Sequence, residues 1–250
     1  MARRPFLGLT ICVLLFATLA SACAPVNAPV APVIAAAQSS LPRNTSPQVA
    51  PADLSAVSQS IDAFGLDLYR SLAKSDQVPA SGNLFFSPYS ISTALAMVYG
   101  GAAGETERQM AATLHYAALP PAQLHPAFNA LDLALLAPGQ PFTLTVANAA
   151  WAQEGYKFRP AYLDLLATNY GVGVRQANFV SEAQREAARA AINGWAAERT
   201  NGRIPELITP GLLTDRTRLV LTNAIYFKGE WGSPFREYET REQAFTRLDG

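Results

Sequence analysis

Side chains that perform acid, base or nucleophilic chemistry are sparse in this 250-residue chain. It has two histidines, His115 and His125, and two cysteines, Cys12 and Cys23. Acyl transfer would need a serine such as Ser87 beside a histidine and a carboxylate, but neither histidine lies in a nucleophile motif. The histidines and cysteines also lack the close spacing of a metal-ligand set. We therefore predict neither an enzyme nor a protein that needs a metal or cofactor.

Asn223 is the polar residue whose position most needs a chemical explanation. It lies in the middle of the apolar run Leu219–Phe227. This run lacks polar and apolar alternation, which predicts a central strand that is buried on both faces. A buried amide raises the free energy of the folded state unless its hydrogen bonds are satisfied. Asn223 is therefore expected to need a polar partner.

The elements that must position these residues are predicted from periodicity. Apolar residues three or four apart predict helices near residues 54–72, 88–99, 104–114, 122–136, 160–166 and 182–200. Alternation predicts a strand from Phe142 toward Trp151, and Gly173–Phe179 is a second candidate strand. Ser87 should cap the second helix, and Ser181 with Gln184 should form a capping box at the last one. The mixture indicates an α+β fold.

The composition restricts the class of protein. Half of the residues are hydrophobic and 15% are charged, which is typical of a soluble globular protein and unlike disordered, collagen-like or multi-span membrane chains. Nineteen Lys and Arg balance nineteen Asp and Glu. Because no basic stripe runs along the chain, we predict no nucleic-acid partner. A core of this size needs no disulfide or metal to be stable.

Residues 1–23 are interpreted as a signal peptide. Arg3 and Arg4 precede the apolar stretch Phe6–Ala20, which is short for a membrane-spanning helix. The arginine pair fits a twin-arginine signal as well as an ordinary positive start, so the export route stays open. Either route predicts an exported protein, outside the cell or at its surface.

The end of this signal predicts a lipid anchor. Leu19–Cys23 resembles a bacterial lipobox, in which Cys23 is acylated and becomes the first residue, although Ala20 replaces a larger aliphatic residue. Simple secretion after cleavage near Ala22 is the alternative. Residues 24–52 are rich in Ala and Pro and carry a single charge, so they are interpreted as a tether between a membrane and a domain that begins at residue 53.

Several segments keep the order and spacing of a known family. Asn83–Ile91 (NLFFSPYSI) and Gly100–Thr106 (GGAAGET) closely resemble the second and third helices of the serpin family. Thr222–Trp231 (TNAIYFKGEW) resembles the third strand of its sheet A. Matches to the second A strand and to helix F lie at Asn148–Trp151, Asn193–Trp195 and Thr200–Ile204. Several long motifs in register are specific, so residues 53–250 resemble the amino-terminal part of a serpin.

The resemblance implies a fold and a mechanism. The fold would be an incomplete serpin, with the helical amino-terminal half and strands 1–3 of sheet A. Serpins inhibit proteases: a serine or cysteine protease cleaves an exposed loop, which inserts into sheet A as a new strand and carries the acylated protease with it. The resemblance also implies that Ser87, Ser90 and Asn223 form a polar shutter cluster beneath the opening sheet, and that Trp231 lies where insertion begins. Without the family resemblance, Ser87 would be interpreted as a helix cap and Trp231 as a core residue.

The resemblance also sets limits. The chain stops at Gly250, before the family's reactive loop, so we expect a fragment that does not inhibit a protease by itself and exposes an apolar edge at Leu219–Phe227. A complete protein is expected to be monomeric. A non-inhibitory serpin that binds or carries another molecule shares all of these motifs and stays open. Residues 122–136 contain no Lys or Arg, which predicts no activation by sulfated glycans through that helix.

Overall fold

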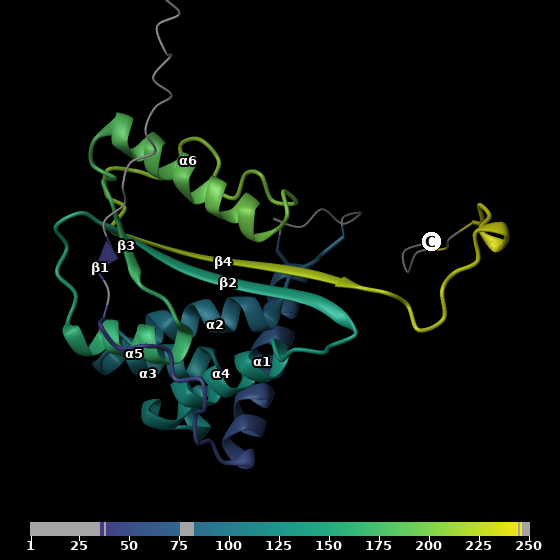
Figure 1. Ribbon diagram of the computed structural model, residues 1–250, viewed down its shortest axis with the longest axis horizontal. Coiled ribbons are helices and arrows are strands. Elements are labelled where there is room, and N and C mark those ends of the chain that lie inside the picture. The colour runs from purple at the N-terminus through teal and green to yellow at the C-terminus, as the bar shows by residue number, and fades with distance from the viewer. Residues whose placement is uncertain (1–35, 38, 76–82, 245, 247–250) are drawn as a thin grey trace, which may run out of the picture. The chain divides into compact units, whose positions relative to one another are not determined.

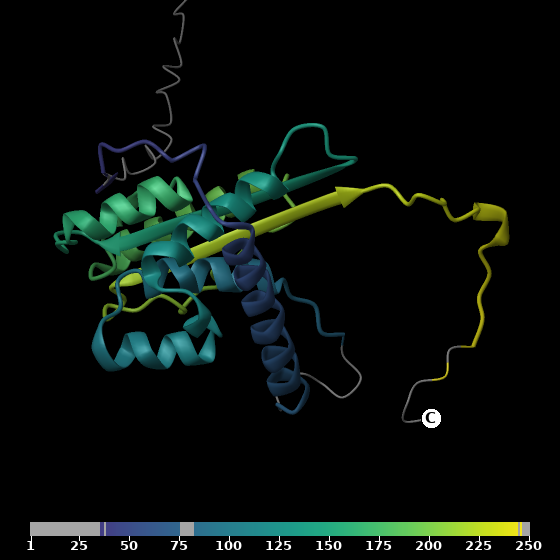
Figure 2. The same cartoon turned by 90° about the horizontal axis from the view of Figure 1, so that it is seen from below.

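The computed structural model describes residues 36–37, 39–75, 83–244 and 246 (Figures 1 and 2). Its elements are β1 (Ala36–Ala37), α1 (Pro51–Ala73), α2 (Pro88–Tyr99), α3 (Gly104–Thr113), α4 (Pro121–Leu135), β2 (Phe142–Gln153), α5 (Pro160–Tyr170), β3 (Val174–Ala177), α6 (Glu182–Arg199) and β4 (Leu219–Gly229). The six helices lie where the apolar spacing predicts them. The predicted signal peptide and Cys23 lie outside the described residues. Within those ranges, none of the helices has the length and hydrophobicity needed to cross a membrane.

The strands form one sheet in the order β1-β3-β2-β4. β2 runs antiparallel beside β4 from Phe142↔Gly229 to Ala152↔Leu219, and the two strands lie side by side in both views (Figures 1 and 2). β4 is thus an edge strand in the described sheet. The prediction of a central strand buried on both faces is wrong there, because only Thr222 and Ala224 along β4 are buried. The exposed edge that we expected at this strand is present.

Helices cover both faces of the sheet, as Figure 1 shows with α6 above it and α1, α2 and α4 below it. The side chains of β2 alternate between the two sides. Ala150 and Ala152 pack into the core of the α1–α5 side, whereas Ala149 and Trp151 pack against α6. Trp151 meets Trp195 of α6 edge to face, with ring centroids 6.4 Å apart.

The start of α6 differs from the predicted capping box. Ser181 is the N-cap residue by its backbone, but its side chain makes no capping hydrogen bond. Asn178 Oδ1 instead accepts hydrogen bonds from the backbone N–H groups of Val180 and Ser181, at 3.0 and 3.2 Å. An Asx turn therefore leads the chain into α6.

The predicted tether extends too far along the chain. Its one charged residue, Arg43, forms an ion pair of 2.6 Å with Asp132 of α4 and donates from Nε to Asn129 Oδ1 at 2.9 Å. The backbone N–H of Asn44 donates to the Thr168 carbonyl of α5 at 2.9 Å. Because these contacts attach the segment to two helices, residues 39–52 belong to the folded unit, and the boundary predicted at residue 53 is wrong.

Candidate functional site

A short line of hydrogen bonds joins α2, β2 and β4 beneath the middle of the sheet. Asn223 Nδ2 donates to Asn148 Oδ1 at 2.6 Å, and Ser90 Oγ donates to Asn223 Oδ1. We call Ser90, Asn148 and Asn223 the amide cluster. Ser90 is buried, and both asparagines are partly buried. Asn223 thus has the polar partners that its place in an apolar run requires.

The register of the two strands brings the asparagine side chains together. Asn148 lies directly opposite Asn223. The backbone N–H of Gln153 donates to the Arg218 carbonyl at 2.9 Å, so the odd-numbered residues of β2 exchange hydrogen bonds with β4. The Asn148–Asn223 pair is consequently a non-hydrogen-bonded pair, whose Cα atoms lie only about 4.5 Å apart. Register, rather than local sequence, therefore makes Asn148 the partner of Asn223.

Ser87 acts on the cluster through the helix that carries Ser90. Its Oγ accepts a hydrogen bond of 3.2 Å from the backbone N–H of Ser90, and Pro88 occupies the first helical position, as predicted. Two of the three predicted shutter residues, Ser90 and Asn223, are therefore in contact, and Ser87 fixes where α2 begins. Asn148 was missed as a member, although it stands within a segment that matches the family.

A second polar contact joins β2 and β4 on the opposite face. The indole N–H of Trp151 donates to Thr222 Oγ1 at 3.0 Å, and the Thr222 hydroxyl donates to the Ala149 carbonyl at 3.3 Å. Beneath the sheet, the hydroxyls of Ser92 and Thr93 are buried without a partner among the described residues. Polar groups of this kind can exchange hydrogen-bond partners when two strands move apart.

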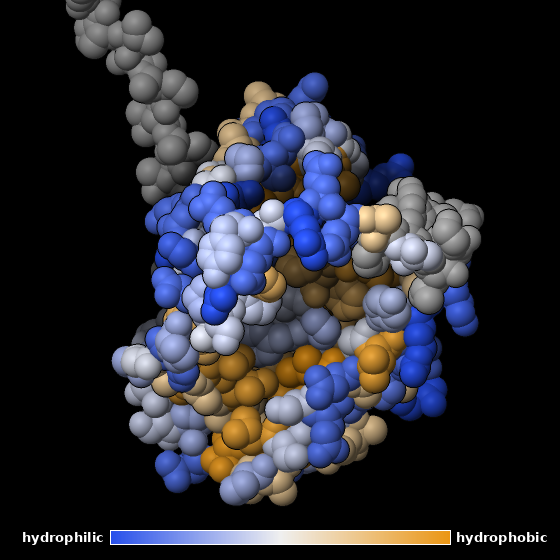
Figure 3. Space-filling view, turned by 90° about the vertical axis from the view of Figure 1, so that its right-hand side faces the viewer, coloured by the Kyte–Doolittle hydropathy of each residue, from blue (hydrophilic) through white to orange (hydrophobic). Residues whose placement is uncertain are grey.

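The outer edge of β4 is open in the described part of the chain. Trp231 follows the strand, is 71% exposed and meets Phe235 edge to face at 5.4 Å. The alternative interpretation of Trp231 as a core residue is therefore wrong. Figure 3 looks onto the end of the sheet where β4 finishes and shows apolar side chains gathered in and below a hollow. Phe227 near the end of β4 and Phe85 before α2 are both exposed.

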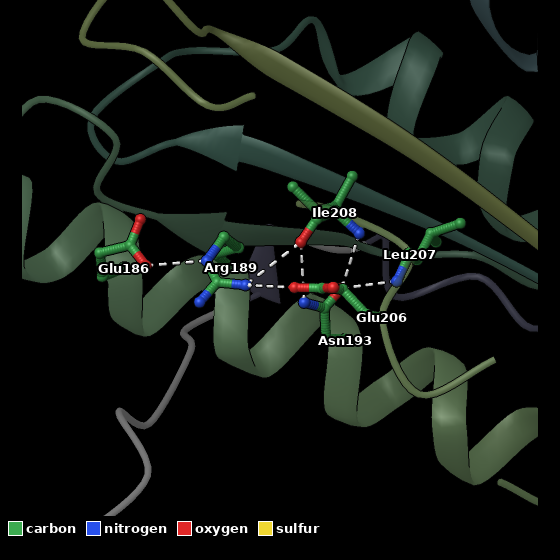
Figure 4. A network of polar contacts seen from close by, with 6 residues as sticks. All are labelled: Glu186, Arg189, Asn193, Glu206, Leu207 and Ile208. Atoms are coloured by element: carbon green, nitrogen blue, oxygen red, sulfur yellow. Dashed lines mark hydrogen bonds and ion pairs between the residues drawn. The ribbon is translucent and has the colours of Figure 1, made fainter. Parts of the chain in front are cut away.

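The connection between α6 and β4 is tied down to α6 (Figure 4). Asn193 Oδ1 accepts from the backbone N–H groups of Leu207 and Ile208 at 2.9 and 2.8 Å, and its Nδ2 donates to the Ile208 carbonyl at 2.9 Å. Arg189 forms ion pairs with Glu186 at 2.8 Å and Glu206 at 3.2 Å. Three bonds from one buried amide hold the segment that leads into β4.

Neither histidine side chain hydrogen-bonds to Ser87 in the described part of the chain. His115 contacts Asp67 at 2.9 Å on the surface. His125 is buried and shares a hydrogen bond of 2.7 Å between Nδ1 and the hydroxyl of Tyr170. Burial lowers the pKa of His125 to about 4, so the ring is neutral at pH 7. Between residues 39 and 244, excluding 76–82, no cluster of three His, Cys, Asp or Glu suits a metal ion.

Comparison with known proteins identifies the family. A profile of the family described as "Serpin (serine protease inhibitor)" matches residues 59–250. The chain belongs to the serpin family. It is 39% identical to the leukocyte elastase inhibitor of Bos taurus over 182 residues, covering 73% of this chain and 46% of that protein. It is 42% identical over 195 residues to an uncharacterized serpin-like protein of Thermococcus kodakarensis, covering 78% of this chain and 43% of that protein.

Solved structures agree with this assignment. Ovalbumin from emu (Dromaius novaehollandiae) matches with a TM-score of 0.70 and 28% identity, covering 76% of this chain and 51% of that one. An Arabidopsis serpin in its native stressed conformation matches with a TM-score of 0.69 and 32% identity, covering 79% and 49%. The chain spans about half the length of the curated relatives it matches. The predicted partial serpin fold, with helices and β3, β2 and β4 side by side, is confirmed.

Proposed function

We propose that the full-length protein is an inhibitor of serine or cysteine proteases that acts by inserting a cleaved loop into the sheet beside β4. The observation that carries this proposal is the amide cluster, which fastens β4 to β2 and α2 by side-chain hydrogen bonds at the middle of the strand. Hydrogen bonds can be remade with a new neighbour, whereas an interdigitated apolar core would resist separation. Asn223 thus holds β4 in place through hydrogen bonds that can form again with other partners when β4 shifts.

The outer edge of β4 is suited to receive a strand. Along β4, the even-numbered residues exchange backbone hydrogen bonds with β2, so the peptide groups of Leu221, Asn223 and Ile225 point to the outer edge. An added strand would bond to these groups directly above the amide cluster. Insertion and release of the cluster would therefore be coupled through one residue, Asn223.

The class of target rests on the family and on the relatives. The family's description names serine protease inhibitors, and the bovine relative is named as an inhibitor of leukocyte elastase. We assign the same class of partner, a serine or cysteine protease, to this protein, together with a monomeric state of the full-length chain. The proposed role is that of an inhibitor and not of an enzyme.

Export and membrane attachment are a separate part of the proposal. The pattern of residues 1–23 supports export, and the lipobox-like run supports acylation of Cys23. Labelling of expressing bacterial cells with a palmitate analogue tests this, with Cys23→Ser as the control. Label that depends on Cys23 supports a lipoprotein, whereas an unlabelled protein in the medium would indicate simple secretion.

The inhibitor proposal is tested with the full-length protein and a panel of elastase, chymotrypsin and trypsin. We expect a band of protease plus serpin that survives boiling in detergent with at least one of them, and no such band when the protease serine has been blocked beforehand. Cleavage by all three without a complex would contradict inhibition of serine proteases. That result would favour the alternative, a non-inhibitory serpin that binds or carries another molecule.

A further inference from the structure

A hollow of about 460 Å³ lies beside β2, on the side opposite to β4. Its lining includes Arg43, Val146, Asn148, Arg175, Trp195 and Arg199. The hollow exists because β3 is shorter than β2 and pairs with it only from Ala150↔Val174 onward. The part of β2 before Ala150 therefore lacks β3 as a neighbour, and Figure 1 shows β2 continuing past the start of β3.

The backbone of β2 offers unused hydrogen-bonding groups to this hollow. The N–H of Glu154 donates to the Ala177 carbonyl of β3 at 2.9 Å, so the even-numbered residues of this strand face β3. Val146 and Asn148 have the same orientation, but β3 does not reach them. No backbone bond from either residue toward the hollow occurs in the described part of the chain. Such groups, about 6.7 Å apart along the strand, are a template for an added strand.

The charges around the hollow are strongly unbalanced. Arg43, Arg175 and Arg199 line it, and among the described residues Asp132 is its only carboxylate. Asp132 is already bound by Arg43 and by the hydroxyl of Tyr89, each at 2.6 Å. The guanidinium of Arg175 lies over the Trp151 ring, 5.0 Å from its centroid. Neither Arg175 nor Arg199 has an acidic partner among the residues that the structure describes.

We propose that this hollow binds an extended acidic segment of a partner protein. The segment would add to the edge of β2 through the backbone groups of Val146 and Asn148, and its carboxylates would pair with Arg175 and Arg199. Free peptide groups at strand spacing favour a peptide over a sulfated sugar, because a sugar lacks the matching alternation of donors and acceptors. The buried indole of Trp195 lies on the same side as these arginines and supplies an apolar wall for the methylene groups of the acidic side chains. The proposal does not depend on protease inhibition, because it concerns the opposite edge of β2.

The test uses the full-length protein and the peptide acetyl-Val-Glu-Val-Glu-Val-Glu-amide. Calorimetric titration at low salt should detect binding, and the peptide with Gln in place of Glu should bind at least tenfold more weakly. Arg175→Gln should weaken binding about fivefold to tenfold, as expected for a partly buried charge pair, and Arg199→Gln, at an exposed position, should weaken it about twofold to threefold. The matched control is Arg216→Gln, an exposed arginine outside the hollow, which should leave affinity unchanged.

Hydrogen exchange distinguishes strand addition from simple charge attraction. The amides of Val146 and Asn148 should gain protection in the presence of the acidic peptide, and both arginine variants should melt at the temperature of the parent chain. The proposal would be overturned if the Gln peptide bound as tightly as the acidic peptide, or if both arginine variants bound the acidic peptide as tightly as the parent protein. So would protection that is absent at Val146 and Asn148, or binding of a heparin-derived hexasaccharide in place of the peptide.

Discussion

Replacing Asn223 by leucine removes the centre of the amide cluster. The change deletes two hydrogen bonds and leaves Ser90 Oγ and Asn148 Oδ1 without their partner. An unsatisfied buried polar group raises the free energy of the folded state by about 1–3 kcal/mol. Ser90 is 8% exposed, so the cost of its unpaired hydroxyl should lie toward the upper end of this range. Asn148 is only partly buried, so the cost of its unpaired amide oxygen should lie toward the lower end. We therefore expect Asn223→Leu to destabilise the full-length protein by about 2–4 kcal/mol.

The assay is thermal unfolding combined with size-exclusion chromatography after mild heating. With an unfolding entropy of about 2.1 cal/mol/K per residue, a loss of that size lowers the melting temperature by roughly 3–5 °C in a protein about twice the length of the matched segment. Because a loosened sheet accepts strands from a neighbouring molecule, we also expect polymers to form. Asn83→Leu, at an exposed position, is the matched control and should change neither property. Adding Ser90→Ala to Asn223→Leu should recover part of the loss, since one unpaired hydroxyl disappears.

The reasoning would be refuted by an Asn223→Leu protein that stays monomeric after heating and melts at the temperature of the parent. A melting temperature that falls without any recovery in the double variant would also count against it. That result would locate the damage in misfit of the leucine side chain rather than in the broken hydrogen bonds.

Three further predictions concern other contacts. The pKa of His125 is about 4 in the folded protein and about 6.5 in the unfolded chain, so the free energy of unfolding should be highest above pH 6.5 and fall by about 3 kcal/mol toward pH 4. Urea unfolding at pH 7.5 and 4.5 measures this loss, and His125→Gln should reduce the dependence of stability on pH. Arg43→Ala should destabilise the fold by about 2–3 kcal/mol, and adding Asp132→Asn should restore part of this in the same urea assay. With no Lys or Arg in residues 122–136, the protein should elute from heparin at or below physiological salt; retention abolished by changes within that helix would contradict this.

Local patterns predicted the helices well, because the apolar face of a helix is formed by residues three or four positions apart in the sequence. The cap at Ser87 is likewise a contact within one helical turn. The pairing of Asn223 with Ser90 came from the family resemblance, since 133 residues separate the two side chains. Its other partner, Asn148, depends on the register of β2 against β4, which local sequence alone does not specify.

Two features were outside the reach of local reasoning. The segment around Arg43 has the composition of a linker, and contacts with distant helices, such as the ion pair with Asp132, 89 residues away, show that it is folded. The apolar run of β4 predicted burial on both faces, yet burial of a strand depends on which neighbours it has, and β4 has one strand neighbour in the described sheet. In both cases the deciding contact is distant in sequence.

Hydrogen exchange at β4 tests the central claim most directly. In the full-length protein, the amides of Leu221, Asn223 and Ile225 should exchange more slowly after cleavage by a protease, because the newly inserted strand would bond to them and hold β4 inside a wider sheet. The even-numbered residues Thr222 and Ala224, already paired with β2, serve as internal references. Protection gained at the three odd-numbered amides is the predicted result. Unchanged exchange at all three in a sample that has formed the covalent protease complex would contradict insertion beside β4.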